Sequence, residues 1–331
     1  MKILYAINDL KIGGAEKQLI LIANKMAENN KVYVLTLWDR GILKKDLSKK
    51  IEYISLNAQK NNFIKVFMKL LKILTKINAD IVHSRLFYIS FILKIAGFFK
   101  KIKLIISQES LDLWRNPFIN IIDSILDFKV YKYCCVSEEV QNKLIKNIEI
   151  DSKKTIIIPN SIILNKKVKK YNNGKIGFLG RNNYAKGIDL FFNYIEKSKE
   201  NNYTVWTDEY GSLENKFFNN IEVGRIDIEI FFDNIDILVL TSRWEGFPVT
   251  VLESAMFGVP VICYENNGIK SVFKDILLYY KDWDDLNKII EKLRNNKVFY
   301  YKCSDLLQNF VNNNFKIENN IKKFIKLYEN I

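Results

Sequence analysis

Segments typical of β-strands alternate with segments typical of amphipathic helices along this chain, and this alternation constrains the fold more than any other feature. The first half runs through "MKILYAIN" (strand), "GAEKQLILIANKMAEN" (helix), "KVYVLTLW" (strand), "FIKVFMKLLKILTKI" (helix) and "ADIVHSRL" (strand). Further strands are predicted in "KLIISQE", "YKYCCVS" and "KTIIIPN", to about residue 160. Strands separated by helices in this way form parallel sheets.

The alternation stops once and then starts again. Residues 165–175, "NKKVKKYNNGK", are polar and have no apolar periodicity, so we predict a linker there. A second series follows: "KIGFLG", "GIDLFFNYIEKSKE", "YTVWTD", "IDILVLTS", "TVLESAMF" and "PVICYE". We therefore expect an N-terminal domain over 1–164, a second domain over 176–305 and a C-terminal helix over 306–331. The predicted fold class is α/β, with two Rossmann-like doubly wound domains facing each other across a cleft and C-terminal helices crossing back to the first.

Length and composition exclude several classes of protein. A chain of 331 residues with 48% hydrophobic residues can bury a large core. The stretch closest to a transmembrane span, residues 86–99, is too short and contains Lys94. The N-terminal segment is typical of a first strand and not of a signal peptide. The four cysteines have no C-x-x-C spacing, which predicts reduced core residues. We expect a cytoplasmic protein.

Positive charge is concentrated in the first half of the chain. Residues 1–163 hold 27 Lys and Arg against 15 Asp and Glu, a net charge of +12, whereas residues 164–331 hold 24 against 22, a net charge of +2. A basic half can meet nucleic acid, an anionic membrane surface or an acidic substrate. The segment 63–77 places four lysines on one helical face: Lys65, Lys69, Lys72 and Lys76. It is either a basic helix lying on a membrane or a core-packing helix with a lysine face.

The stretch "SRWEGFPVTVLESAMFGVPVI", residues 242–262, holds two glutamates in an apolar setting. A strand ends before "RWEGFP" and a helix follows, so Glu245 lies in the loop and Glu253 about one turn into the helix. Free N–H groups at the helix start attract a diphosphate. Carboxylates beside it would accept hydrogen bonds from sugar or ribose hydroxyls. The alternative is that Glu253 faces solvent on an ordinary helix.

Six segments, taken in order, resemble those of a known family. "EGFPVTVLE" is similar to the E-x7-E signature of family 4 retaining glycosyltransferases of the GT-B fold, and the others are "GGAEKQ", "ADIVHSRLF", "CVSEEVQNKL", "IIIPNSI" and "GFLGRNNYAKGIDLF". The resemblance implies a metal-independent enzyme of hexosyltransferase type. It would move a sugar from a nucleotide-diphosphate sugar to a glycan or polyprenyl-diphosphate-linked acceptor, in bacterial surface polysaccharide synthesis (LPS, capsule or O-antigen).

The resemblance assigns the donor diphosphate to two pairs of residues. Gly13 and Gly14, after the first strand, would let the backbone approach it. Arg181 and Lys186 would hold it and stabilise the departing nucleoside diphosphate. Without the resemblance, the first pair is an ordinary turn and the second a pair of exposed loop cations.

The resemblance assigns the sugars of the donor to the glutamates. Glu253 would bind the ribose hydroxyls, and Glu245 would bind hydroxyls of the transferred sugar. The backbone N–H groups of Gly246 and Phe247 would lie nearby.

A single histidine fits a mechanism in which the leaving phosphate assists deprotonation of the acceptor. His83 would orient the donor sugar or the acceptor, or it is a hydrogen-bonded structural residue; both interpretations stay open. Many relatives have a second histidine two residues later, where this chain has Arg85. Arg85 is therefore a candidate contact to the sugar or the acceptor.

We expect no cofactor and no metal, and favour UDP over GDP in the donor. The one D-x-D, at 282–284, could suggest a metal site of the other glycosyltransferase fold, but it stands at the start of a helix, where acidic residues commonly form the cap, and we predict a structural role for it. The expected partners are the donor, the acceptor and an anionic surface at the inner face of the plasma membrane, where the protein would be peripheral. Alternatives are an epimerase of the same fold and a non-catalytic binding protein. Nucleic-acid binding, suggested by the net charge of +14, is not expected because no recognition motif is present.

Overall fold

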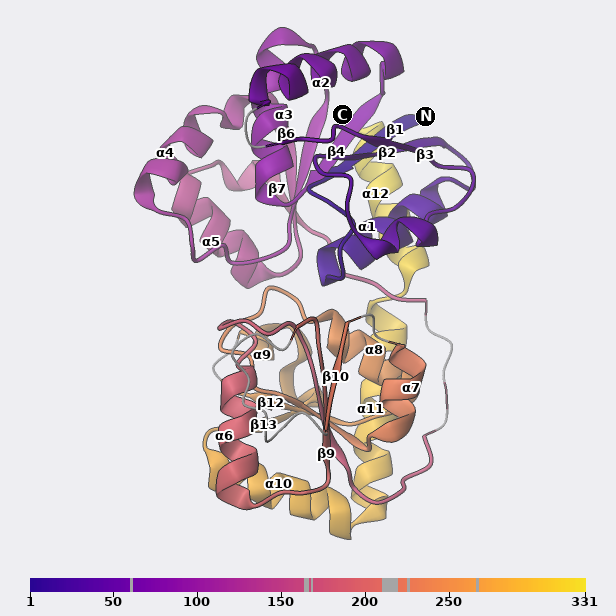
Figure 1. Cartoon of the computed structure of the whole chain (residues 1–331), viewed down its shortest axis with the longest axis vertical. Coiled ribbons are helices and arrows are strands. Elements are labelled where there is room, and N and C mark those ends of the chain that lie inside the picture. The colour runs from indigo at the N-terminus through magenta and orange to yellow at the C-terminus, as the bar shows by residue number, and fades with distance from the viewer. Residues whose placement is uncertain (60–61, 164–166, 168, 210–219, 225–226, 266–267) are drawn as a thin grey trace. The chain divides into compact units, whose positions relative to one another are not determined.

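The computed structural model describes the chain except residues 60–61, 164–166, 168, 210–219, 225–226 and 266–267. It divides into two compact units. The N-terminal unit contains Met1–Asn160 and Ile317–Ile331, and the C-terminal unit contains Ser161–Lys316. Each unit has one sheet with flanking helices (Figure 1). Within each sheet the neighbouring strands are parallel, which confirms the predicted α/β class.

The N-terminal sheet has the strand order β3-β2-β1-β4-β5-β6-β7. Its central strands are buried almost throughout, which explains their continuous apolar sequences. The strands are β1 (Lys2–Ile7), β2 (Lys31–Thr36), β3 (Glu52–Ser55), β4 (Ile81–Arg85), β5 (Leu104–Gln108), β6 (Val130–Cys135) and β7 (Thr155–Ile157). The helices are α1 (Gly14–Met26), η1 (Ile42–Asp46), α2 (Phe63–Ile77), α3 (Phe87–Phe99), α4 (Pro117–Ile125), η2 (Asp127–Lys129), α5 (Glu138–Ile148), η3 (Ser152–Lys154) and, from the chain end, α12 (Ile317–Glu329).

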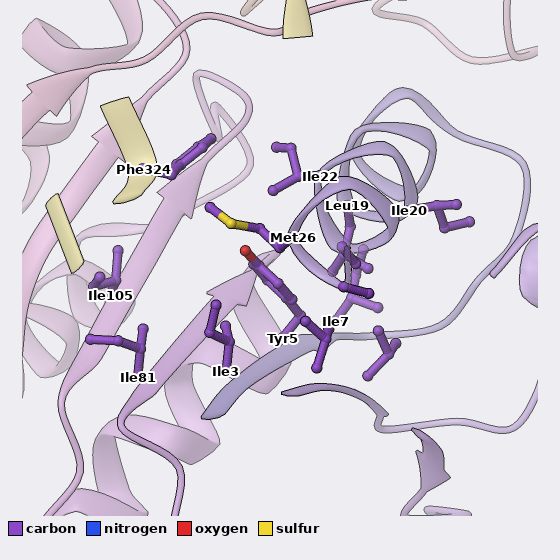
Figure 2. Packing of buried hydrophobic residues seen from close by; sticks show 14 of the residues in the cluster. Ile3, Tyr5, Ile7, Leu19, Ile20, Ile22, Met26, Ile81, Ile105 and Phe324 are labelled. Carbon is purple, nitrogen blue, oxygen red and sulfur yellow. The ribbon is translucent and has the colours of Figure 1, made fainter. Parts of the chain in front are cut away.

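Helix α12 completes the core of the N-terminal unit. Phe324 of α12 belongs to the same buried cluster as the strand residues Tyr5 and Ile105 (Figure 2). Near the end of α12, Tyr328 is also buried. The units differ from the sequence-based segments at this point, because one continuous helix of the C-terminal unit, α11 (Lys297–Asn314), runs through the boundary expected at 305. Of the C-terminal helices, α12 belongs to the first unit. The expected return of the chain end to the first domain is therefore made by this helix.

The C-terminal sheet has the order β10-β9-β8-β11-β12-β13. Its strands are β8 (Ile176–Leu179), β9 (Tyr203–Thr207), β10 (Ile221–Val223), β11 (Ile237–Leu240), β12 (Val261–Tyr264) and β13 (Leu278–Tyr280). Its helices are α6 (Ile188–Ser198), α7 (Ile228–Asn234), α8 (Val249–Phe257), α9 (Lys270–Phe273), η5 (Lys274–Ile276), α10 (Trp283–Asn295) and α11. The predicted linker, 165–175, lies partly outside the described residues, and its described part belongs to this unit.

Both sheets reverse their strand order at one place. The chain builds outward from β1 through β2 to β3 and then continues with β4 on the other side of β1. In the C-terminal unit the same reversal lies between β8 and β11. Loops at the carboxyl ends of the two strands at such a point diverge and leave a crevice, where ligands of doubly wound sheets bind.

Helix α2 packs on the core through one apolar stripe, as the core-packing interpretation of 63–77 predicts. The buried stripe consists of Val66, Leu70, Leu74 and Ile77. Lys69 donates hydrogen bonds to the carbonyl oxygens of Ser55 (2.7 Å) and Leu56 (3.4 Å). Across the described part of the chain, no helix is long and apolar enough to cross a bilayer. All four cysteines are buried and free, which confirms that prediction.

Candidate functional site

Two loops meet at the switch point of the C-terminal sheet. The first follows β8 and leads into α6; the second follows β11 and leads into α8. Gly187, with φ +65°, closes the first loop, and a side chain at this position would collide with the carbonyl oxygen of Thr241 in the second. The Thr241 hydroxyl donates a hydrogen bond to the Gly187 carbonyl at 2.6 Å. The glycine is required here because the left-handed backbone and the close approach coincide.

Arg243 fixes the two loops to each other. Its backbone N–H donates to the Ala185 carbonyl at 2.8 Å, and its guanidinium binds both carboxylate oxygens of Asp189 at 2.9 and 2.6 Å. The guanidinium also lies over the Tyr184 ring, 3.9 Å from its centroid. Hydrogen bonds from Arg243 lower the pKa of Asp189, so the carboxylate stays ionised. A bidentate pair of this kind holds one geometry, and it positions the residues on both loops.

The structure brings Lys186 and Glu245 into direct contact at this point. The Lys186 ammonium donates to Glu245 Oε1 at 2.6 Å, and the Ser242 hydroxyl donates to the same oxygen at 2.7 Å. The Lys186 side chain is 24% exposed and that of Glu245 is 8% exposed, so the pair is accessible through Lys186. A carboxylate has about four acceptor positions. Glu245 therefore keeps capacity to accept from a sugar hydroxyl while it holds Lys186.

The remaining predicted residues of this unit lie on the same two loops or on α8. Arg181 is exposed on the loop after β8. Glu253 is the fifth residue of α8 and is buried, so the solvent-facing alternative for it is wrong. Gly246 lies on the loop before α8. The Phe247 ring is buried against Phe315, with ring centroids 5.2 Å apart, and the predicted role of its backbone N–H stays a prediction.

The glycine turn of the N-terminal unit carries a carboxylate of its own. Gly13 is the N-cap of α1, and Gly14 is its first residue. The Glu16 carboxylate folds back over Gly13 so closely that a side chain at this position would collide with it. A carboxylate in the first turn complements the helix dipole. Glu16 thus lies where the resemblance places an anion, and the roles of Gly13 and Gly14 stay predictions.

His83 lies inside the N-terminal unit and is fully buried. Its Nδ1 is 2.6 Å from the Tyr328 hydroxyl, and its Nε2 is 2.8 Å from the Ser107 hydroxyl. Burial, reinforced by the charge of Arg85, holds the His83 pKa well below its usual range, so the imidazole is neutral. These contacts match the interpretation of His83 as a hydrogen-bonded structural residue. Its predicted role at the donor sugar or the acceptor stays a prediction.

Arg85 forms an ion pair with Glu109 inside the same unit. The two side chains are 3% and 8% exposed. Burial raises the pKa of Glu109, and the neighbouring Arg85 opposes this shift. A guanidinium that is buried as well as paired has little surface left for an acidic sugar or a phosphate. The predicted contact of Arg85 with a ligand therefore stays untested.

A pocket at the switch point of the N-terminal sheet contains residues that sequence reasoning missed. It has a volume of about 380 Å³ and is lined by residues after β1, β4 and β5. Tyr88 and Trp114 stand half exposed at its side, with ring planes 23° apart and centroids at 6.4 Å. Glu109 and Asp112 supply carboxylates to its wall. Flat aromatic rings beside hydrogen-bond acceptors suit a sugar. The exposed tryptophan in "LDLWRNP" was the available signal.

Leu86, which lines this pocket, has a strained backbone conformation. It has φ 68° and ψ 149°, a conformation that only glycine adopts readily. Its strain costs on the order of 1–3 kcal/mol. The turn at Leu86 ends β4 and directs Phe87 and Tyr88 into the first turn of α3, at the pocket wall. Strain of this kind collects at functional sites, so it marks the pocket as a candidate site.

The D-x-D motif is a helix cap. The Asp282 carboxylate is the N-cap of α10 and accepts from the backbone N–H of Asp285 at 2.8 Å, which confirms its predicted structural role. Within the residues described, no group of three His, Cys, Asp or Glu is arranged to hold a metal ion.

Comparison with protein families matches nearly the whole chain to two models. Residues 12–166 match the model described as "Glycosyltransferase Family 4". Residues 160–317 match "Glycosyl transferases group 1". The second match contains the Lys186–Glu245 pair, and the first contains the residues that line the pocket at Trp114, except Asn8.

Several proteins of enteric bacteria are similar over most of the chain. A Klebsiella pneumoniae protein described as "Uncharacterized 41.2 kDa protein in cps region" is 22% identical over 80% of this chain and 82% of its own length. The Escherichia coli "O-antigen biosynthesis glycosyltransferase WbnH" is 23% identical over 87% and 89%. The Escherichia coli "UDP-Gal:alpha-D-GlcNAc-diphosphoundecaprenol alpha-1,3-galactosyltransferase" is 27% identical over 59% of each chain.

Solved structures share the fold. Anabaena HepE in complex with UDP-glucose has a TM-score of 0.86, with 17% identity, and covers all of both chains. WaaG, described as "a glycosyltransferase involved in lipopolysaccharide biosynthesis", has a TM-score of 0.70, with 15% identity over 94% of this chain and 95% of its own. These similarities support the predicted two-domain Rossmann-like fold of the GT-B class.

Proposed function

Because the chain belongs to the family 4 glycosyltransferases, whose two models together match residues 12–317, we propose that it transfers a hexose from a nucleoside diphosphate sugar to a glycan or lipid-linked glycan. The transfer retains the anomeric configuration and needs no metal ion. The observation that carries this proposal is the Lys186–Glu245 pair, with the Ser242 hydroxyl on the same carboxylate oxygen, at the switch point of the C-terminal sheet. It provides a cation and a hydroxyl acceptor at one place.

The C-terminal unit binds the donor in this proposal. Lys186 and exposed Arg181 pair with the diphosphate, whose negative charge increases as the sugar leaves. Glu245 accepts hydrogen bonds from hydroxyls of the transferred hexose. Glu253 accepts from the ribose, and the loop at Gly246 offers backbone N–H groups. Two cations in a partly dry site perform the charge neutralisation that a metal performs elsewhere.

The reaction exchanges one bond at the anomeric carbon. The bond to the β-phosphate oxygen breaks, and the acceptor hydroxyl oxygen forms the new bond on the same face of the sugar. The hydroxyl proton passes to the released phosphate oxygen. Lys186 and Arg181 stabilise the diphosphate that accepts this proton, so no protein base is used.

The acceptor sugar binds in the pocket at Tyr88 and Trp114. Its aromatic and acidic lining suits an uncharged or amino sugar, which stacks on a ring and donates hydroxyls to carboxylates. Similarity to a cps-region protein and to an O-antigen glycosyltransferase supports a role in bacterial surface polysaccharide synthesis. We propose a lipid-linked acceptor, and peripheral attachment to the inner face of the plasma membrane.

UDP is the preferred nucleotide in this proposal. Two similar proteins support this choice by their descriptions: one is described as using UDP-Gal, and HepE was solved with UDP-glucose. Neither similarity identifies the sugar that this chain transfers.

Thermal unfolding tests the donor site. UDP-, GDP- and ADP-hexoses are added to the wild type in EDTA, because a ligand that binds only the folded state raises the Tm. We expect UDP-sugars to raise it, and Glu253→Ala and Arg181→Ala to remove the shift. Lys197→Ala changes an exposed cation of the same unit and serves as the control. A shift that survives both site variants would contradict the proposed donor site.

The product distinguishes transfer from the alternatives. We expect NMR of the product to show the anomeric configuration of the donor, in EDTA. An epimerase would convert the nucleotide sugar without acceptor. A binding protein would bind the donor and release no nucleotide when acceptors are added.

A further inference from the structure

Helix α4 of the N-terminal unit exposes apolar residues to solvent and buries a charged one. In most surface helices the apolar face packs inward and the polar face meets water. In α4 the apolar residues Phe118, Ile121 and Ile125, spaced at i, i+3 and i+7, are 70%, 58% and 64% exposed. The buried residue of α4 is Asp123. The helix lies at the left edge of its unit in Figure 1.

A buried ion cluster keeps α4 in this orientation. The Asp123 carboxylate accepts from the Lys94 ammonium of α3 at 2.5 Å and from the Arg115 guanidinium at 2.9 Å. Burial lowers the pKa of Lys94, and the Asp123 charge opposes this shift. Breaking one partner of a buried charge pair is strongly destabilising. The polar face of α4 is therefore committed to the interior, and its apolar face cannot turn inward.

Further exposed apolar side chains lie on α3 and on η2, which follows α4 directly in the chain. Phe98 and Phe128 lie edge to face with centroids 5.3 Å apart, and Phe128 follows α4 in the chain. Phe99 contacts Phe67 of α2 at 5.7 Å. We call this set of exposed side chains on α3, α4 and η2 the outer apolar face; it consists of Phe98, Phe99, Phe118, Ile121, Ile125 and Phe128. Monomeric soluble domains rarely expose so many large apolar side chains together unless something binds there.

Lysines border the outer apolar face. A groove of about 590 Å³ lies between the end of α3 and η2, and it is lined by Phe98, Phe99, Phe128 and four lysines: Lys100, Lys101, Lys129 and Lys154. Lys154 pairs with Asp127 at 2.6 Å. The Lys129 ammonium lies 4.7 Å from the Phe98 centroid and 4.9 Å from that of Phe128. Among the residues that the structure describes, no carboxylate is within ion-pair distance of Lys100, Lys101 or Lys129.

We propose that the outer apolar face docks on an anionic lipid bilayer, with α4 inserted at the boundary between headgroups and acyl chains and with lipid phosphates in the lysine groove. Apolar area and nearby cations together are what anionic bilayers bind. A second copy of this chain fits less well, because a symmetric contact would bring the two lysine groups together. The inference deepens the proposed membrane attachment and does not depend on the donor site.

Vesicle co-sedimentation tests the docking surface, with no donor or acceptor present. Wild-type protein is mixed with vesicles of equal parts phosphatidylglycerol and phosphatidylcholine, or of phosphatidylcholine alone. We expect binding to the anionic vesicles and weak binding to the neutral ones. In the triple variant Phe118→Ser, Ile121→Ser, Ile125→Ser, the partition coefficient for anionic vesicles should fall at least about tenfold. The reason is that three apolar side chains no longer bury their surface in the membrane interface.

The matched control changes exposed apolar residues of α2. The variant Ile64→Ser, Met68→Ser removes exposed apolar side chains of the same unit, leaves the stacked rings of Phe63 and Phe67 in place and should bind like the wild type. A second variant tests the contribution of charge. Binding to anionic vesicles should weaken by about fivefold per lysine in Lys100→Gln, Lys101→Gln, Lys129→Gln. The same change at Lys65, Lys72 and Lys76 of α2 should have a smaller effect. Unchanged Tm values show that each variant is folded.

Three results would overturn the proposal. The first is anionic-vesicle binding by the α4 variant that equals that of the wild type. The second is loss of binding in the α2 variant instead, which would assign the membrane contact to α2. The third is a wild-type dimer that the α4 variant converts to a monomer, which would identify a second copy as the occupant. Donor-induced Tm shifts are measured separately, so failure of docking and failure of the donor site are distinguishable.

Discussion

The two units place polar side chains at the same point of the same topology, yet they use them differently. In the C-terminal unit the Lys186–Glu245 pair stands at the switch point and stays partly exposed. In the N-terminal unit His83 and Arg85 stand on β4, beside the switch point, and both are sealed. Both ring nitrogens of His83 have hydroxyl partners, and Arg85 has Glu109.

This difference shows that chemical type alone does not identify a ligand contact. A side chain can act on a ligand when it is held in place and stays partly exposed, as Lys186 does. A histidine whose nitrogens are both occupied instead joins three parts of one core, β4, β5 and α12. In the proposed function, the ligand contacts of the N-terminal unit are the half-exposed rings of Tyr88 and Trp114.

Removing the Lys186 ammonium should have the largest effect. Lys186→Ala is expected to lower kcat by about 10²- to 10³-fold, the usual loss when one group that stabilises developing charge is removed. His83→Gln should lower kcat less than about tenfold, because His83 is buried and both of its ring nitrogens contact protein hydroxyls. Initial rates at saturating donor and acceptor check this, with Lys197→Ala as the control. Equal losses of kcat for Lys186→Ala and His83→Gln would contradict the distinction between the partly exposed Lys186 and the buried His83.

Tyr328→Phe should destabilise the N-terminal unit. It leaves the buried His83 Nδ1 without its partner, which costs about 1–3 kcal/mol of unfolding free energy. Chemical denaturation measured by circular dichroism checks this. Tyr184→Phe, at an exposed position on the other unit, should change stability by less than about 0.5 kcal/mol. If the two variants are equally stable, the hydroxyl at Tyr328 does not support His83.

Trp114→Ala should weaken acceptor binding alone. Loss of one stacking ring costs about 1 kcal/mol, so the KM for the acceptor should rise about five- to tenfold while the Kd for the donor nucleotide stays the same. Trp114→Phe keeps a ring and should restore most of the affinity. Steady-state kinetics and calorimetry separate the two constants. A change in donor affinity would place Trp114 in the donor site instead.

The smallest expected effect is the pH dependence that His83 gives to stability. The imidazole is neutral in the folded state because its pKa is held well below 6.5, whereas an unfolded histidine binds a proton near pH 6.5. Below that pH the unfolded state binds more protons, so stability falls as pH falls, by at most about 1.4 kcal/mol per pH unit. Above pH 6.5 the contribution is constant. Denaturation of wild type and His83→Gln between pH 5 and 8 checks this: the variant should show the shallower slope, and parallel slopes would contradict it.

Sequence reasoning located most regular elements because their signals are local. The segment 63–77 was predicted as a helix with the bounds that the structure has, because its apolar spacing repeats along the chain. It gave no strand for β3, β10 or β13, which are three or four residues long. Edge strands this short carry few apolar residues, and only their parallel pairing to a neighbour makes them strands.

The candidate site divides in the same way. The sequence predicted four residues of the candidate site because they lie in short segments that resemble those of the family: Glu245, Glu253, Arg181 and Lys186. That Lys186 contacts Glu245 is not visible, because 59 positions separate them in the chain. The face on which α4 is apolar could be read from its sequence, but a pattern cannot tell whether that face points inward.

By itself the sequence determined the fold class, the repeat of two parallel-sheet units and the segments that carry the chemistry, since these depend on periodicity and on neighbouring residues. Only the tertiary structure decided which polar groups are open and which are sealed. His83 is sealed by Tyr328, 245 positions away, and α4 is turned outward because Lys94 holds Asp123. Burial and pairing are set by contacts between distant segments, and a linear pattern contains no record of them.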